Sequence, residues 1–121
     1  MVKRKRTGPE YVKPYDSKEM HLPGCNYCGP GTNVTRRMRE RVQPMNRLDR
    51  ACKSHDIDTE SRGPQRATTA KQIRASDMKL AREAKRIALD PKTNKRERAL
   101  AWVVHRAMLM NKWRSNRWLR Q

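Results

Sequence analysis

Apolar residues recur every three or four positions in three stretches of this chain, and the first stretch starts near Asn46. Asn46 and Asp49 stand three apart, which approximates a capping box at a helix N-terminus. Gly63-Pro64 is a strong breaker and ends the pattern. The stretch predicts a helix on which the following residues share one face: Leu48, Cys52, His55 and Thr59.

A second stretch runs from about Thr68 to Leu89 and ends at Asp90-Pro91. Its apolar stripe is made of Ile73, Asp77, Leu80, Ala84 and Ile87, and therefore includes one acid. A buried carboxylate is costly unless it is paired, and the ring of His55 on an antiparallel helix would pair with Asp77. The alternative is that Asp77 lies at the edge of the stripe and reaches solvent.

A third helix is expected to start near Thr93 or Asn94, after a polar turn. We expect its residues Val103, Ala107 and Met110 to pack into the core. His21 and His105 are expected to be ordinary surface or partly buried histidines.

The last quarter of the chain also holds all three tryptophans, Trp102, Trp113 and Trp118, among many basic residues. Basic amphipathic helices with tryptophan are typical of membrane interfaces. We expect residues 114–120 to contact lipid or nucleic acid, and the alternative is that the apolar side of this helix only completes the core.

The breaks between these stretches predict three parts. Residues 1–22 form a basic flexible N-terminal tail, residues 23–90 form the core, and residues 91–121 form a basic amphipathic C-terminal helix. Within the core, the glycines and prolines of residues 23–46 favour loops, with at most a short helix around Val34 to Val42.

Composition adds a requirement for an anionic partner. The 121 residues allow one small domain with a thin core, since only 35% are hydrophobic and none is Phe. A net charge of +18 exceeds what solubility needs, so phospholipid head groups or nucleic acid are expected partners. The cluster Lys3–Arg6 could also direct the chain to the nucleus. It is followed by no apolar signal sequence, and no run of about 18 apolar residues occurs, so we expect neither a signal peptide nor a transmembrane segment.

The pair His55-Asp56 and the loop Gly29-Pro30-Gly31 are the strongest candidates for chemistry. A carboxylate directly after a helical histidine can hold a cation while the histidine activates water beside it. Glycines let a loop curl so that several backbone carbonyls converge, and calcium accepts such carbonyls readily. These features predict a calcium site next to a general base.

At these residues the chain resembles the phospholipase A2 superfamily, whose calcium loop reads Y-x-G-x-G and whose catalytic helix reads C-x-x-H-D. The matching residues are Tyr27, Gly29, Gly31, Cys52, His55 and Asp56. Within the superfamily the chain is most similar to the short, disulfide-poor domains attached to parvovirus capsid proteins, where the loop commonly reads G-P-G. A later A-D-like motif is matched by Ala75-Ser76-Asp77. The resemblance covers roughly residues 20 to 90.

The resemblance implies an all-α, small phospholipase A2-like fold: a calcium loop, two antiparallel catalytic helices and an additional basic C-terminal helix. His55 would be the general base and Asp77 would fix its tautomer. The Ca²⁺ ligands implied are the carbonyls of Tyr27, Gly29 and Gly31 and the carboxylate of Asp56.

The resemblance also implies a disulfide between Cys28 and Cys52. Three reduced cysteines packed as small apolar groups remain the alternative, and Cys25 has no obvious mate. Cys25-x-x-Cys28 alone is half of a zinc motif, but further ligands beyond Cys52 are lacking nearby, so we expect no zinc.

Two departures from the family pattern bear on turnover. Thr59 stands where the family usually has a tyrosine that supports the distal aspartate, and Asp58 adds a further negative charge that either tunes calcium affinity or faces solvent.

The expected function is calcium-dependent hydrolysis of the sn-2 acyl ester of phospholipids by a viral, capsid-associated enzyme, acting from the virion on a host endosomal membrane. The alternative is a catalytically weak, phospholipase-like basic protein that binds nucleic acid or anionic membranes. A secreted venom-type enzyme ranks third, because it would need more cysteines and a signal peptide.

Overall fold

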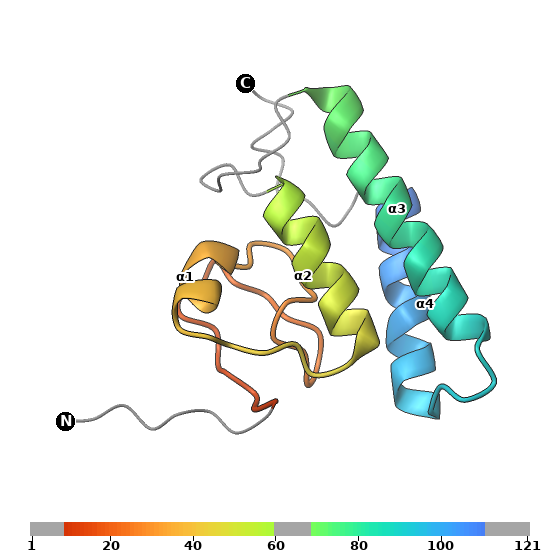
Figure 1. The fold of residues 1–121 in the computed structure, drawn as a ribbon, viewed down its shortest axis with the longest axis horizontal. Helices are drawn as coiled ribbons and strands as arrows, with labels where there is room; N and C mark the ends of the chain where they lie inside the picture. The colour runs from red at the N-terminus through yellow and green to blue at the C-terminus, as the bar shows by residue number, and fades with distance from the viewer. Residues whose placement is uncertain (1–8, 60–68, 111–121) are drawn as a thin grey trace.

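The computed structural model describes residues 9–59 and 69–110, and the regular structure in these residues is helical (Figure 1). Its elements are α1 (Val34–Arg39), α2 (Arg47–Thr59), α3 (Ala70–Leu89) and α4 (Lys95–Leu109). The predicted all-α class is therefore confirmed. None of the described helices is both long and apolar enough to cross a membrane.

Four sequence features named above lie outside the described residues. They are the cluster Lys3–Arg6, the breaker Gly63-Pro64, the last two tryptophans, and the basic end at residues 114–120.

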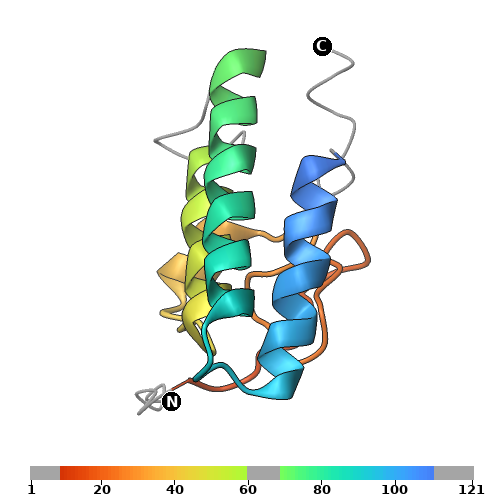
Figure 2. The ribbon, with the colours of Figure 1, turned by 90° about the vertical axis from the view of Figure 1, so that its right-hand side faces the viewer.

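The three longer helices form an antiparallel set in which α3 lies between α2 and α4 (Figures 1 and 2). Helix α1 lies beside α2, on the side away from α3 (Figure 1), and the glycine-containing loop is joined to α2 by the Cys28-Cys52 disulfide. This arrangement places the predicted catalytic helices next to each other and the predicted calcium loop against one of them.

Side-chain caps start the longer helices where the sequence predicts. Asn46 accepts a hydrogen bond from the Asp49 N–H at 2.9 Å, so α2 begins as expected. The return bond of a full capping box is absent, because the Asp49 carboxylate is used elsewhere. At α3, Thr69 and Gln72 form a complete capping box, and at α4 the Asn94 side chain accepts from the Glu97 N–H at 2.8 Å.

One core cluster extends from the glycine loop and α2 through α3 to α4. Every predicted stripe residue of α3 is buried, namely Ile73, Asp77, Leu80, Ala84 and Ile87. The small side chains of Ala84 and Ala88 face this core together with Ala101, which permits close packing of the two helices.

The prediction for the buried face of α4 is wrong for Val103 and Met110, which are exposed, whereas Ala107 is half-buried and packs against the core as predicted. The fully buried residues of α4 are Ala101, Val104 and Met108. The apolar residues of α4 form two neighbouring stripes at helical spacing. The buried stripe is the one that places Ala101 in the core with the alanines of α3.

Residues 10–22, which we expected to belong to a flexible tail, are hydrogen-bonded to the rest of the fold. Leu22 N–H donates to Cys28 O at 2.8 Å, and Met20 N–H donates to Pro30 O at 3.0 Å. This segment therefore lies directly along the glycine loop. The contacts begin well before residue 23, where we predicted the core to start.

Candidate active site

The two side chains predicted to form a catalytic dyad, His55 and Asp77, lie in direct contact. His55 Nε2 of α2 is 2.7 Å from Asp77 Oδ1 of α3, and both side chains are almost fully buried. A carboxylate only accepts hydrogen bonds, so the ring nitrogen at this contact is the N–H donor. The alternative that Asp77 reaches solvent is excluded by its 1% exposure.

The other ring nitrogen of His55 faces Asp56. Nδ1 lies 3.7 Å from Asp56 Oδ1, and no described residue comes within hydrogen-bonding distance of it. With Nε2 fixed as the donor, Nδ1 carries the lone pair of the neutral ring. The dyad thus presents a proton acceptor on the side of the predicted cation ligand Asp56.

The electrostatics of this dyad favour a charged ring. Burial alone would lower the pKa of His55, but the carboxylates of Asp56 and Asp77 outweigh it and raise the pKa to about 9. A neutral base at ordinary pH therefore requires something that offsets one of these negative charges.

The glycine loop points alternate carbonyls to opposite sides. Cys28 O and Pro30 O accept hydrogen bonds from the segment at residues 18–22. Tyr27 O and Gly29 O point the other way and both accept from Thr32 Oγ1, at 3.3 and 3.0 Å. Two of the three predicted calcium carbonyls thus converge on one point.

Both loop glycines are required by the close approach of the preceding segment. A Cβ on Gly29 would lie 1.7 Å from Met20 O, and a Cβ on Gly31 would lie 1.9 Å from Lys18 O. Both also have positive φ, 153° and 78°. Any side chain at either position would push the loop away from residues 18–22, the segment that lies behind it.

Asp49 anchors the start of the loop from α2. Its fully buried carboxylate accepts from the N–H groups of Asn26, Tyr27 and Cys28 at 2.8 to 3.0 Å, and from Met45 N–H at 2.9 Å. Charge-assisted bonds of this kind are about twice as strong as neutral ones. The loop backbone is therefore fixed to the same helix that carries the His55-Asp56 pair.

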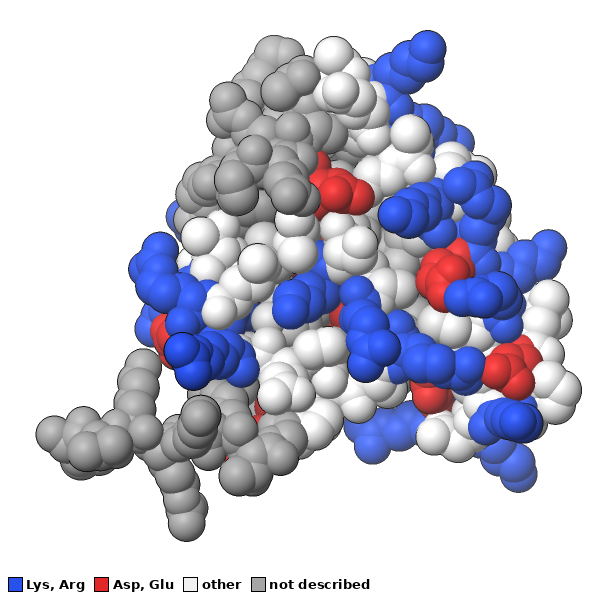
Figure 3. Space-filling view, in the orientation of Figure 1, with Lys and Arg blue, Asp and Glu red and all other residues white. Residues whose placement is uncertain are grey.

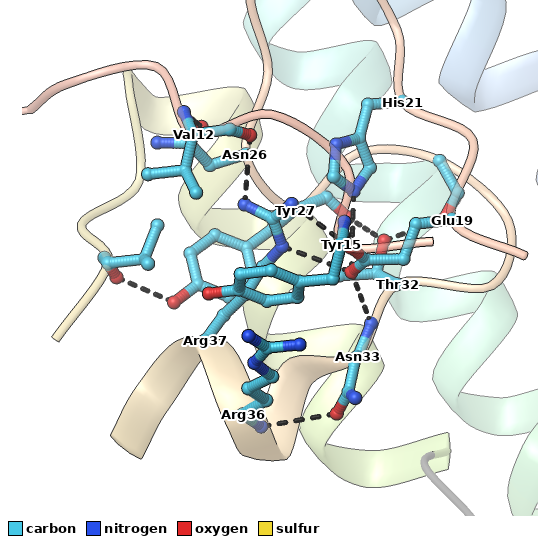
Figure 4. A network of polar contacts seen from close by, with 12 residues as sticks. Val12, Tyr15, Glu19, His21, Asn26, Tyr27, Thr32, Asn33, Arg36 and Arg37 are labelled. Atoms are coloured by element: carbon cyan, nitrogen blue, oxygen red, sulfur yellow. Dashed lines mark hydrogen bonds and ion pairs between the residues drawn. The ribbon is translucent and has the colours of Figure 1, made fainter. Parts of the chain in front are cut away.

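A second anchor holds the segment that backs the loop (Figure 4). The fully buried guanidinium of Arg37 donates to both carboxylate oxygens of Glu19, at 3.1 and 3.2 Å, and to the carbonyls of Val12 and Lys13. Burial alone would raise the pKa of Glu19, but the hydrogen bond from Arg37 and those from backbone N–H groups lower it. The Glu19-Arg37 pair is thus an ionised clamp between α1 and residues 12–19.

A disulfide joins the loop to the catalytic helix. Cys28 is bonded to Cys52, with their Cα atoms 5.1 Å apart, which is the pairing that the resemblance implied. Among the described residues, Cys25, Cys28 and Asp49 form the one group of three Cys, His, Asp or Glu side chains whose ligand atoms lie close enough to share a metal ion. Cys28 is consumed by the disulfide, Asp49 already accepts four N–H groups, and burial raises the pKa of the Cys25 thiol to about 12. These donors do not suit zinc.

Thr59 and Asp58, the two departures from the family pattern, each form a hydrogen bond. Thr59 Oγ1 donates to His55 O at 2.9 Å, one turn back on α2. Asp58 Oδ2 accepts from Ser76 Oγ of α3 at 3.3 Å, so it helps to join the two catalytic helices.

A groove of about 360 Å³ runs between α2 and α3, and His55 forms part of its lining. Its cationic lining residues are Arg47, Arg50, Lys79 and Arg86. Lys and Arg cover much of the face on which α2 and α3 lie (Figure 3). The lining also carries two acids, Asp58 and Glu83, so the four cations leave an excess of positive charge that would attract an anion to the groove.

The remaining two histidines are both partly buried as whole residues, as expected. His105 is half-buried, as expected, and its Nδ1 lies 2.8 Å from Ala81 O. The side chain of His21 is 2% exposed and lies 3.8 Å from Glu19, and burial lowers its pKa. His21 belongs to the segment that backs the loop.

Sequence reasoning missed three positioning residues: Asp49, Arg37 and Asn26. The spacing of Asp49 from Asn46 indicates a residue of a helix cap, so the sequence did not predict that Asp49 holds the loop. Arg37 is one of 30 basic residues and has no distinguishing pattern. Asn26 is fully buried and bonds through its side chain to the backbone of Val12 and Gln43. Its place directly beside the loop tyrosine is the one signal in the sequence.

Comparison with known proteins agrees with this geometry. The family model of the phospholipase A2-like domain matches residues 18–90, more than half of the chain. The match covers the backing segment, the glycine loop, α1, α2 and α3, and leaves out α4. No curated protein and no solved structure matched the chain. The chain belongs to the phospholipase A2-like domain family.

Proposed function

We propose that this protein is a calcium-dependent phospholipase A2 that hydrolyses the sn-2 ester of phospholipids. The observation that carries the proposal is the buried His55-Asp77 contact on adjacent helices, with Nδ1 of the same ring directed at Asp56. The family match supports phospholipase chemistry of this type.

The loop and Asp56 fit a calcium site. Tyr27 O and Gly29 O already converge on the Thr32 hydroxyl, and oxygen donors of this kind suit a hard cation. The carbonyl of Gly31 and the carboxylate of Asp56 would complete the protein ligands. Calcium bound there would polarise the ester carbonyl and stabilise the oxyanion that develops on it.

The protein's own groups perform the proton transfers. His55 Nδ1 takes a proton from the water whose oxygen attacks the ester carbonyl carbon. Asp77 keeps Nε2 in its N–H form and stabilises the imidazolium. The imidazolium then returns the proton to the lysophospholipid alkoxide as it leaves, which restores the neutral ring.

The first test measures fatty-acid release from phospholipid vesicles in calcium and in EGTA. We expect release by the native chain in calcium only, and a fall of about 100- to 10,000-fold in His55→Gln, because the general base is lost. Asp56→Asn should also abolish release. Asp16→Asn, which changes an exposed carboxylate outside the dyad and the loop, is the control and should keep calcium-dependent release.

Release that persists in EGTA or in His55→Gln would contradict the mechanism. No release from folded native chain in ample calcium would favour the alternative, a catalytically weak basic protein. The net charge of +18 supports that alternative, in which nucleic acid or anionic membranes are the partners.

We further propose a viral role, because the loop and the motif at residues 75–77 are most similar to those of parvovirus capsid domains. The enzyme would be carried with the virion and would open a host endosomal membrane. Release of a dye from endosome-like vesicles by the native chain, and not by His55→Gln, is the expected result.

A further inference from the structure

The outward face of α4 carries large apolar side chains that the described fold leaves open to solvent. Trp102, Val103, Leu109 and Met110 are 37% to 58% exposed and lie on one side of the helix. Isolated apolar residues are ordinary on a protein surface, but a contiguous patch marks an interaction site. The family match ends at residue 90, so it does not account for this face.

Trp102 is held in position and is not a loose surface residue. The ring of His105 packs edge-on against it, with centroids 5.6 Å apart, and His105 Nδ1 lies 2.8 Å from Ala81 O of α3. Together with Val103, Arg106 and Leu109 these two rings line a shallow hollow on α4. The hollow therefore has apolar and aromatic walls and one cation.

The charges on this face all have one sign. Lys95, Arg96 and Arg106 are exposed on α4. The one acid of this helix, Glu97, is half-buried and lies 3.9 Å from Arg47. Arg106 is the cation that lines the hollow itself.

We propose that the outward face of α4 is a docking surface for anionic phospholipid membranes. Tryptophan settles at the level of the head groups, aliphatic side chains enter the acyl region, and arginine pairs with lipid phosphate. A second copy of a chain with charge +18 would be repelled. Nucleic acid would use the cations but would gain little from Val103, Leu109 and Met110.

This surface can be altered without touching the candidate active site. α4 lies on one side of α3 and α2 lies on the other (Figure 2). Membrane docking and ester hydrolysis are therefore separable properties, and the docking proposal does not require that the chain be an active lipase.

The test measures sedimentation with vesicles of phosphatidylcholine alone and of phosphatidylcholine mixed with phosphatidylglycerol. The full chain is used as His55→Gln in EGTA, so that the lipid stays intact. We expect strong binding to the mixed vesicles. The triple variant Val103→Gln, Leu109→Gln, Met110→Gln should weaken it at least about tenfold, since each buried CH₂ is worth about fourfold.

Arg106→Gln should weaken binding to the mixed vesicles about fivefold, the effect of one cation near an anionic surface, and should leave the weak binding to phosphatidylcholine unchanged. Leu89→Gln removes a leucine at the end of α3 that is more exposed than Leu109, at 62% against 43%, and is the apolar control. Arg39→Gln, on α1, is the matched charge control. Neither control should change apolar insertion, and circular dichroism checks that all variants fold.

Unchanged vesicle binding in the triple variant would overturn the proposal. So would a native dimer that the same triple variant dissolves while vesicle binding persists, because the face would then be an interface between copies. The proposal would also be overturned if Leu89→Gln weakened binding to the mixed vesicles as much as the triple variant does. None of these outcomes bears on hydrolysis, which a water-soluble short-chain phospholipid measures separately.

Discussion

The glycine loop and the α3-α4 pair are held by opposite kinds of interaction. The loop is fixed by buried charge: Asp49 accepts four backbone N–H groups, and Arg37 clamps Glu19 behind the loop. The helix pair is fixed by close contact of small apolar side chains such as Ala84, Ala101 and Val104.

The difference reflects what each region has to present. The proposed cation site would be built from carbonyls of irregular backbone, whose N–H groups have no helical partners and must be satisfied individually by side chains. A helix pair satisfies its own backbone, so it needs only a complementary apolar surface. Substitutions of the residues that hold the loop should therefore impair both stability and activity. Substitutions in the apolar contact between α3 and α4 should impair stability alone.

The largest effect is expected for Asp49→Asn. The amide keeps one acceptor, but its NH₂ group faces N–H donors, so at least two buried donors lose their partner at about 1–3 kcal/mol each. We expect the free energy of unfolding to fall by about 3–5 kcal/mol, measured by urea denaturation, together with loss of calcium-dependent ester hydrolysis.

Asp16→Asn is the control for Asp49, because Asp16 is exposed and accepts one local N–H from Lys18. It should leave both quantities unchanged. If Asp49→Asn were as stable as the native chain, the loop would have to be held mainly by the disulfide and by the backing segment.

A smaller effect is expected for Arg37→Lys. Lysine keeps the charge but loses the two-pronged contact with Glu19 and the bonds to Val12 and Lys13 carbonyls. We expect a loss of about 2–4 kcal/mol in urea denaturation, with weaker calcium dependence because the segment behind Gly29 and Gly31 loosens.

Arg36→Lys is a matched control at the next position. Arg36 is exposed, pairs with Glu40 on the same helix, and stacks on Tyr15. No measurable change is expected. Equal effects at the two positions would show that burial of the Glu19-Arg37 pair is not what stabilises the loop.

The same contrast explains how far the sequence alone could go. Periodicity located α2, α3 and α4 and the buried stripe of α3, because a helix that buries one face repeats its apolar residues. The His55-Asp77 contact followed from an acid on that stripe, together with the resemblance. These are features in which position along the chain determines position on a face.

Periodicity could not reveal the clamps. Nothing in the sequence around Arg37 distinguishes it from Arg36, since the two differ only in which of them the fold buries. Residues 10–22 looked like a tail because their order comes from long-range bonds to Asn26 and Arg37. The face of α4 was misassigned for a related reason, since both of its apolar stripes satisfy the period and only the alanines of α3 select one.

The smallest effect is expected in the helix pair, for Ala84→Leu. Ala84 is fully buried against α4, so the larger side chain forces the helices apart and should cost about 1–3 kcal/mol in urea denaturation. Ala75→Leu, exposed on the same helix, should cost nothing. Because Ala84 lies about two helical turns along α3 from Asp77, folded Ala84→Leu should keep its full calcium-dependent activity. Loss of activity with the fold intact would mean that α4 supports the His55-Asp77 contact through α3, and the separation of loop and helix functions would then fail.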